Sequence, residues 1–219
     1  MFKICIIGLG YVGLPLALNI SKKFETIGFD INKKRIIQLN KNHDSNFEFK
    51  KKDFKKKNIK FSNKINEIQE CTYYIICVPT PIDLKNKPEL SALKKTFDIL
   101  KKIIKINDTI ILESTVYPGI TNLFGTFLQK NTGLKQNKDF FIGYSPERIN
   151  PGDNTKKLTQ IDKIFSTQIK SKKKINNIKK IYKLVCKKLI FTRNIQEAEA
   201  AKVIENIQRD LNIALFNEI

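Results

Sequence analysis

The chain has 219 residues, 41% of them hydrophobic, so it is long enough to bury a core and too apolar to be a disordered tail. Lysine and arginine number 41 against 21 acidic residues, and the formal charge of +20 favours an anionic ligand. The lysines lie among asparagines and isoleucines along the whole chain and are not gathered around aromatic side chains. We therefore expect a solvated basic surface and no nucleic-acid partner, with a polyanion-binding module as the alternative.

In chain order, short apolar runs alternate with segments of helical periodicity. The runs "FKICIIG", "TIGFD", "YYIICVP", "TIILEST" and "FFIGYSP" are predicted strands, and helices are predicted over residues 11–23, 32–41, 91–105 and 120–130. Two further short strands are expected near residues 163 and 189, on either side of a helix over 172–186. Strands that are apolar on both faces and separated by helices predict a Rossmann-like, doubly wound α/β fold with a mainly parallel sheet.

The last segment, from Gln196 onward, contains neither glycine nor proline and consists largely of strong helix formers. It predicts one long helix that is still running at Ile219, so the chain looks cut short. We therefore assign residues 1–194 to the Rossmann-like domain and residues 195–219 to the start of a long central helix.

The cysteines, the single histidine and the lengths of the apolar runs indicate the cellular compartment and the kind of site to expect. Four cysteines lie far apart without a C-x-x-C pair and are predicted to be buried free thiols in a reducing compartment. The single histidine, His43, lies in a polar loop without a second ligand at a useful spacing, so no metal site is expected. No apolar run approaches about 18 residues and the N-terminus lacks a cleavage-site pattern, so we expect a cytoplasmic protein without a membrane span.

Three glycines at the spacing G-x-G-x-x-G follow the first predicted strand and open the first predicted helix, in the stretch "GLGYVG". In such a motif Gly8 permits the tight turn, Gly10 lets the backbone approach a pyrophosphate, and Gly13 lets the helix pack on the strand. The phosphates would lie at the helix N-terminus. The motif predicts a dinucleotide site, and the alternative is that the glycines serve packing only.

The second predicted strand ends on Asp30, where a carboxylate can accept both hydroxyls of an adenosine ribose and would repel a 2′-phosphate. We therefore expect NAD as the cofactor in preference to NADP. Lys33, Lys34 and Arg35 leave NADP open, since cations at these positions could accommodate a phosphate. Arg35 could instead lie flat along the adenosine.

Three loops at the carboxyl ends of predicted strands carry unusual polar residues. The loop "CVPTPID" pins Thr80 between two prolines, so that its hydroxyl can face the cofactor; a plain turn is the alternative. In "ESTVYPG", Ser114 and Thr115 could cap the next helix or hold a water or substrate near the nicotinamide. The loop "GYSPERINPGD" holds the carboxylate of Glu147 and the cation of Arg148 between prolines.

One face of the final predicted helix carries Lys202 and Asn206, four residues apart. An ammonium and an amide side by side could stabilise a developing oxyanion. Spacing alone favours the alternative, a solvated helix face, so this pair depends on its structural context.

Taken together, the motifs GLGYVGLP, PTP, ESTVYPG, SPERINPGD and AEAAKVIENIQRDLNIALFNE, with Asp30, resemble the UDP-glucose/GDP-mannose dehydrogenase family, and within it the UDP-N-acetylhexosamine 6-dehydrogenase branch. The resemblance runs from Met1 to Ile219. It implies an enzyme that oxidises the C6 hydroxymethyl of a UDP-N-acetylhexosamine to a carboxylate with two NAD, through a thiohemiacetal and a thioester on a cysteine. It also implies a homodimer and a role in polysaccharide biosynthesis.

The resemblance also implies roles for individual residues. The cofactor-binding set, with the glycine motif included, comprises Gly8, Gly10, Tyr11, Val12, Gly13, Asp30, Arg35, Pro79, Thr80 and Thr115. Thr115 is further implied to lie near the reacting water, and Glu147 to assist proton movement or water positioning. Lys202 and Asn206 would stabilise oxyanions at C6, while Arg148 and Asn150 would face the substrate.

The sequence departs from the family pattern in two respects. The family's nucleophilic cysteine lies in a glycine-rich motif beyond the central helix, and it cannot be replaced by Cys5, Cys71, Cys77 or Cys186. The stretch "KIFSTQIKS" also differs from the small, glycine-containing segment usual there. We therefore expect the chain to bind NAD without completing the oxidation alone. Alternatives are a dehydrogenase of the 6-phosphogluconate or hydroxyacid type and a non-catalytic nucleotide-binding module.

Overall fold

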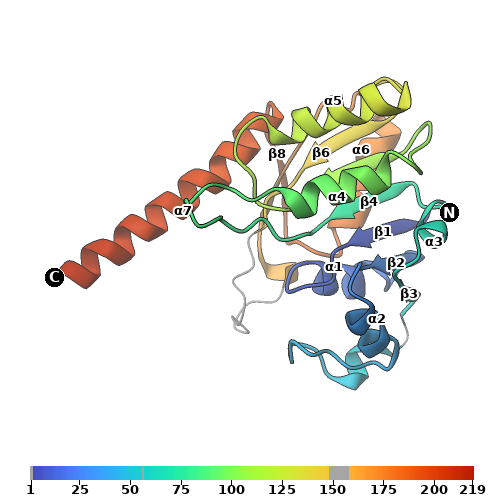
Figure 1. Cartoon of the computed structure of the whole chain (residues 1–219), viewed down its shortest axis with the longest axis horizontal. Coiled ribbons are helices and arrows are strands. Elements are labelled where there is room, and N and C mark those ends of the chain that lie inside the picture. The colour runs from blue at the N-terminus through green and yellow to red at the C-terminus, as the bar shows by residue number, and fades with distance from the viewer. Residues whose placement is uncertain (1, 56, 148–157) are drawn as a thin grey trace.

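The computed structural model describes residues 2–55, 57–147 and 158–219, and within them eight strands form one sheet with helices on both faces (Figure 1). The strands lie in the order β3-β2-β1-β4-β5-β6-β7-β8. Their bounds are β1 (Ile4–Ile7), β2 (Thr26–Phe29), β3 (Ile59–Ser62), β4 (Tyr73–Ile76), β5 (Thr109–Leu112), β6 (Phe141–Tyr144), β7 (Lys163–Thr167) and β8 (Leu189–Phe191). The helices are α1 (Gly13–Ile20), α2 (Lys33–Asn40), α3 (Ile65–Ile68), α4 (Ser91–Leu100), α5 (Ile120–Thr132), α6 (Lys172–Tyr182) and α7 (Ile195–Glu218), with short 3₁₀ turns η1 (Lys51–Phe54) and η2 (Leu158–Gln160).

The sheet is parallel from β3 to β6. Strand β7 runs antiparallel to β6, and β8 pairs in parallel with β7. After β3 the chain returns to the other side of β1 and forms β4, so the strand order reverses between β1 and β4. The prediction of a Rossmann-like, mainly parallel sheet is confirmed, and the reversal marks the place where a dinucleotide crevice is expected.

Both faces of the sheet are buried. Along β1, Ile4 and Ile6 belong to one apolar cluster, whereas Cys5 and Ile7 belong to another. Because successive side chains of a strand point to opposite faces, the two clusters are the cores on the two sides of the sheet. Helices α1, α2 and α6 contribute to the first core, and α4 and α5 to the second. Because both faces of the sheet are buried, the sequences of the strands are continuous apolar runs.

Some elements differ from the sequence prediction. Strand β3 and helix α3 were not predicted: β3 lies at the edge of the sheet and is only partly buried, and α3 has four residues, so neither leaves a clear apolar period. The helix expected over 91–105 ends at Leu100, and the one expected over 172–186 ends at Tyr182. In both places the chain continues as tight turns, in which a backbone N–H donates to the carbonyl oxygen three residues earlier. These hydrogen bonds run from Ile103 N to Leu100 O and from Val185 N to Tyr182 O.

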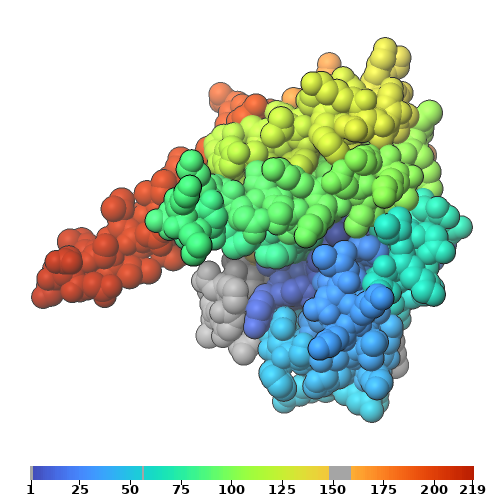
Figure 2. Space-filling model, in the orientation of Figure 1, coloured from blue at the N-terminus to red at the C-terminus, as the bar shows by residue number. Residues whose placement is uncertain are grey.

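Helix α7 starts against the sheet and then extends away from the rest of the chain (Figure 1 and Figure 2). The Asn194 side chain caps its start by accepting a hydrogen bond from the Glu197 N–H. Ile195, Ala198 and Glu199 in its first turns are buried, whereas every residue from Ile207 onward is exposed. Within the described ranges, no helix is both long and apolar enough to cross a membrane.

Candidate cofactor and active site

A cavity of about 710 Å³ lies at the carboxyl edge of the sheet, between the strand-end loops and helices α4 and α7. Its volume suits a dinucleotide-sized ligand. Its lining brings together most of the predicted site residues, namely Gly8, Gly10, Tyr11, Val12, Asp30, Pro79, Thr80, Thr115, Glu147, Lys202 and Asn206. Gly13 and Arg35 do not line it, and Arg148 and Asn150 lie outside the described residues.

Two of the three glycines of the first loop, Gly8 and Gly13, are required by steric constraints within the structure. Gly8 has a φ of +90°, and a Cβ there would lie 2.8 Å from the Cys77 carbonyl oxygen. A Cβ on Gly13 would lie 1.8 Å from the Gly8 carbonyl oxygen, whereas a Cβ on Gly10 would meet nothing within 4 Å. The open space beside Gly10 leaves room for a phosphate to approach the backbone. Val12, the N-cap of α1, makes no side-chain cap. The Leu14 N–H already donates to the Gly10 carbonyl oxygen at 3.2 Å and Pro15 has no N–H, so a phosphate at this helix start would bind N–H groups that precede Leu14.

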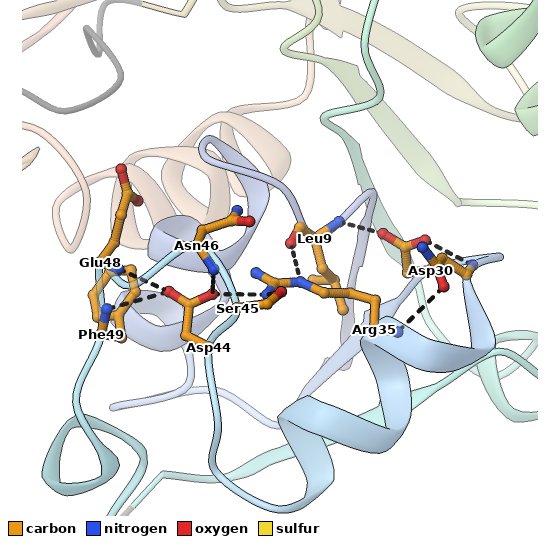
Figure 3. Close-up of polar contacts among 9 residues, drawn as sticks. Leu9, Asp30, Arg35, Asp44, Ser45, Asn46, Glu48 and Phe49 are labelled. Atoms are coloured by element: carbon orange, nitrogen blue, oxygen red, sulfur yellow. Dashed lines mark hydrogen bonds and ion pairs between the residues drawn. The ribbon is translucent and has the colours of Figure 1, made fainter.

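Asp30 is held in place by the glycine loop. Its Oδ2 accepts a hydrogen bond from Leu9 N at 2.9 Å, and its Oδ1 accepts one from Asn32 N at 2.9 Å (Figure 3). Each carboxylate oxygen retains a lone pair that can accept a hydroxyl hydrogen. The carboxylate therefore fits the ribose role, because both of its oxygens are fixed at the wall of the cavity.

Replacing Asp30 with alanine is expected to weaken NAD binding by about tenfold or more, since hydrogen bonds to a charged group contribute about 1.5–3 kcal/mol. NADP binding should fall less or improve, because the charge that would repel a 2′-phosphate is gone. Isothermal titration calorimetry with both nucleotides measures the ratio of dissociation constants. Asp98→Ala, which removes an exposed carboxylate from α4, is the matched control and should leave that ratio unchanged. An unchanged ratio in Asp30→Ala would contradict the ribose assignment.

Arg35 connects the glycine loop to the segment that follows α2. Its Nε donates to the Leu9 carbonyl oxygen at 2.9 Å, and its Nη1 donates to Asp44 Oδ1 at 2.7 Å and to Ser45 Oγ at 3.0 Å (Figure 3). It lines a smaller cavity of about 470 Å³ that shares Gly10 and Asp30 with the larger one. Its Nη2 is buried without a hydrogen-bond partner among the described residues. The structure thus gives Arg35 a structural role, and its contact with the adenosine stays a prediction.

The hydroxyls of the strand-end loops join neighbouring loops. Thr80 Oγ1 donates to the Thr115 carbonyl oxygen at 2.7 Å, and Ser114 Oγ donates to the Val78 carbonyl oxygen at 2.6 Å. The loops after β4 and β5 are thereby fixed to each other at the cavity wall. One of the two alternatives for Ser114 and Thr115 was that they cap the next helix, and this alternative is wrong. Helix α5 begins after Gly119 and has no cap from its own N-cap side chain.

The N-terminus of α5 is instead capped by Glu199 of α7, a residue that the sequence analysis missed. Its buried carboxylate accepts hydrogen bonds from Gly119 N at 2.7 Å, from Thr121 N at 2.9 Å and from Thr121 Oγ1 at 2.6 Å. A carboxylate four residues after the buried Ile195, on the same helix face, was the available signal. This contact anchors α7 beside the loop that carries Thr115.

Anchored in this way, α7 brings Lys202 and Asn206 to the cavity. The Lys202 side chain is 10% exposed, and its Nζ lies 3.4 Å from Glu205 Oε2. Asn206 Oδ1 accepts a hydrogen bond from Arg209 Nη1 at 3.4 Å. The structure therefore places the pair at the cavity wall, which the spacing alone did not require.

A buried cluster of charged groups meets the cavity, because two of its members, Glu113 and Glu147, line the cavity. Lys163 Nζ donates to Glu113 Oε2 at 2.5 Å and lies 3.9 Å from Glu147 Oε2. The Tyr182 hydroxyl donates to Glu113 Oε1 at 2.5 Å. Burial raises the pKa of Glu113, an effect that the Lys163 charge opposes. Burial alone would lower the pKa of Lys163, but attraction to the two carboxylates outweighs it and the pKa is raised, so the ammonium keeps its proton.

The sequence analysis assigned no role to Glu113 or Lys163. Glu113 begins the stretch "ESTVYPG", in which only the hydroxyls of Ser114 and Thr115 were given a role. Lys163 lies at the start of a short predicted strand. The only sequence signal was that each is a charged residue within an apolar run, where an unpaired charge would be costly. The two are 50 positions apart, so nothing local showed that they meet.

The four cysteines are free and buried, as predicted. Cys77 lines the cavity, but burial and the Glu113 charge raise the pKa of its thiol well above the ordinary value. Burial likewise raises the pKa of Cys186 to about 11. A thiol in such surroundings is a poor nucleophile, because the reactive thiolate is disfavoured.

Within the described ranges, no cluster of three or more histidine, cysteine or acidic residues is placed to hold a metal ion.

The fold and this cavity define a nicotinamide-dinucleotide-binding domain of the dehydrogenase type. The model of the NAD binding domain of the UDP-glucose/GDP-mannose dehydrogenase family matches residues 2–186, and the chain belongs to this family. The resemblance noted in the sequence is confirmed, and NAD is the cofactor of the domain.

Curated relatives and solved structures agree with the family match. The chain is 44% identical to UDP-N-acetyl-D-glucosamine 6-dehydrogenase of Salmonella typhi over 220 residues, which cover 99% of this chain and 51% of the relative. It is similar to the structure of the UDP-D-ManNAc dehydrogenase of Pyrococcus horikoshii, with a TM-score of 0.89 and 31% identity over 99% of this chain and 53% of the other. The chain thus spans about half the length of the curated relatives it matches.

Proposed function

We propose that this chain is the NAD-binding part of a UDP-N-acetylhexosamine 6-dehydrogenase, which oxidises the sugar C6 hydroxymethyl to a carboxylate. The observation that carries this proposal is the single cavity that has the glycine loop and Asp30 in its wall together with Thr115, Glu147, Lys202 and Asn206. NAD bound there would supply the hydride acceptor. The relatives named as UDP-N-acetyl-D-glucosamine and UDP-N-acetyl-D-mannosamine dehydrogenases support this substrate class.

In this proposal the protein residues divide into two groups. The N–H groups at the start of α1 hold the pyrophosphate and Asp30 holds the ribose, which favours NAD over NADP. The Lys202 ammonium and the Asn206 amide donate hydrogen bonds to oxyanions at C6. Glu147 assists proton movement or positions the reacting water, which lies near Thr115. None of the four cysteines present supplies the thiolate that the second oxidation requires.

A chimera tests this proposal. The part of the Salmonella typhi relative that lies beyond the matched half would be fused after Ile219, and NADH absorbance followed with UDP-N-acetyl-D-glucosamine. We expect the chimera to form two NADH per sugar and the 219-residue chain to form none. In the chimera, Lys202→Ala and Asn206→Ala should each lower kcat by about 10²–10³, the usual effect of losing an oxyanion donor. Full activity of both variants, or two NADH per sugar from the 219 residues alone, would contradict the proposal.

We further propose that the complete protein is a homodimer joined through α7. On this helix Ile204, Ile207, Leu211 and Leu215 are 63%, 52%, 65% and 57% exposed, an apolar surface that a partner would cover. Sedimentation velocity is expected to show self-association of the chain that increases with concentration and is abolished by the double change Ile207→Glu and Leu211→Glu. A monomer at high concentration with α7 helical would contradict this proposal.

The cysteines and the product class support two broader proposals. Four buried, unpaired thiols suit a reducing compartment, so we place the protein in the cytoplasm. A UDP-uronic acid product would serve polysaccharide biosynthesis.

A further inference from the structure

A second cavity, of about 470 Å³, lies beside the carboxylate that fits the ribose role. It shares Leu9, Gly10, Tyr11 and Asp30 with the larger cavity. Among the described residues that line it, Asp30 is the only acidic one. The rest of the lining consists of side chains that can donate hydrogen bonds, namely Asn32, Lys34, Arg35, Gln38, Ser45 and Asn46. Apart from Asp30, this wall therefore suits an anion.

The Asp30 carboxylate is itself bound in the way that a phosphate would be. Its two oxygens accept hydrogen bonds from the backbone N–H groups of Leu9 and Asn32, each at 2.9 Å (Figure 3). Asn32 is the N-cap of α2, so the carboxylate also lies beside the start of that helix, where negative charge is favoured. Converging backbone N–H groups of this kind are a common phosphate-binding arrangement.

Two cationic residues of α2 line the same cavity. The Arg35 side chain is 9% exposed, and its Nη2 has no hydrogen-bond partner among the described residues. A buried donor without an acceptor is unfavourable, so an oxygen of a ligand would stabilise it. Asp44 already balances the charge of Arg35 at 2.7 Å. Lys34, which is exposed at the cavity wall, is therefore the cation that a phosphate would meet.

The position of Asp30 identifies the anion. A carboxylate that accepts a hydrogen bond from the ribose 2′-hydroxyl lies directly beside it, so a phosphate on that hydroxyl would take the place of the carboxylate. We propose that Asp30 occupies a preformed site for the 2′-phosphate of NADP, so that this one carboxylate sets the preference for NAD. Once it is removed, the N–H groups of Leu9 and Asn32 bind the phosphate together with Lys34. This inference rests on NAD binding in the larger cavity.

Titration of Asp30→Ala with NAD and NADP separates a preformed phosphate site from a mere loss of repulsion. The two nucleotides differ only in the 2′-phosphate, so a cavity wall without phosphate donors would bind them equally once the carboxylate is gone. We expect NADP to bind Asp30→Ala at least about tenfold more tightly than NAD does, because charge-assisted hydrogen bonds to the phosphate are gained. NADP should also bind Asp30→Ala at least about tenfold more tightly than it binds the unmodified chain.

A second substitution in the Asp30→Ala background locates the phosphate. Adding Lys34→Gln should weaken NADP binding about tenfold and leave NAD binding unchanged, since only NADP carries the group that Lys34 would meet. Lys33→Gln is the matched control, because it removes the neighbouring lysine of the same helix, which lines neither cavity. It should leave the ratio of the two dissociation constants unchanged.

Isothermal titration calorimetry gives both dissociation constants for each variant. If Asp30→Ala does not fold, Asp30→Ser takes its place, because the serine hydroxyl can still accept a hydrogen bond from one of the two N–H groups. NADP that binds the folded variant no more tightly than NAD, or a gain that Lys34→Gln does not reduce, would overturn the inference while leaving NAD binding intact. Failure of the unmodified chain to bind NAD would overturn the assignment of the larger cavity together with it.

Discussion

Replacing Asp44 with alanine is expected to lower the free energy of unfolding by about 3–5 kcal/mol, because it leaves the buried guanidinium of Arg35 without its counter-ion. Asp44 is 4% exposed and Arg35 is 8% exposed, and their charged atoms lie 2.7 Å apart. The Asp44 carboxylate also accepts backbone hydrogen bonds from Asn46, Glu48 and Phe49, so the loop after α2 would lose its anchor (Figure 3).

Denaturant unfolding followed by circular dichroism measures this effect. NAD affinity should fall as well, since the Arg35 Nε holds the Leu9 carbonyl within the glycine loop. Asp98→Ala is the control, because it breaks an exposed ion pair to Lys101 and should change the unfolding free energy by about 0.5 kcal/mol or less. A loss below about 1 kcal/mol in Asp44→Ala would show that the buried pair does not stabilise the loop.

Replacing Glu199 with alanine is expected to cost about 3–5 kcal/mol, because two backbone N–H groups and one hydroxyl at the start of α5 lose their acceptor. The three hydrogen bonds, to Gly119 and Thr121, are 2.6–2.9 Å long and buried or partly buried. The same change releases α7 from the loop after β5, so Lys202 and Asn206 are no longer fixed at the cavity.

Hydrogen exchange at the amides of Gly119 and Thr121 tests this contact directly, and both should exchange faster in Glu199→Ala. NAD affinity should change much less than stability, because the glycine loop and Asp30 lie on other elements. Glu218→Ala removes a glutamate from the exposed end of the same helix and should affect neither measurement. Unchanged exchange at both amides would contradict the capping role of Glu199.

The parts of the site that could be predicted from the sequence are those set by local backbone geometry. Gly8 is required by its positive φ, and Gly13 by the close approach of the Gly8 carbonyl oxygen. Asp30 is positioned by its place directly after strand β2. Such constraints act within one strand–turn–helix unit, so the spacing of a few residues reveals them.

The parts that could not be predicted depend on side chains that meet from distant segments. Glu113 and Lys163 are 50 positions apart, and Glu199 and Thr121 are 78 apart. No period or spacing links such pairs before the fold is known. The structural role of Arg35 was not predicted, because its partner Asp44 lies in an irregular loop that carries no motif.

Calorimetric titration of the unmodified 219-residue chain with NAD and NADP tests the central claim most directly. If the cavity is a dinucleotide site with Asp30 on the ribose, the chain will bind one NAD with a dissociation constant at least about tenfold lower than that for NADP, since a 2′-phosphate would meet the fixed carboxylate. Equal binding of NADP would contradict the ribose assignment, and the absence of NAD binding would contradict the assignment of the cavity itself.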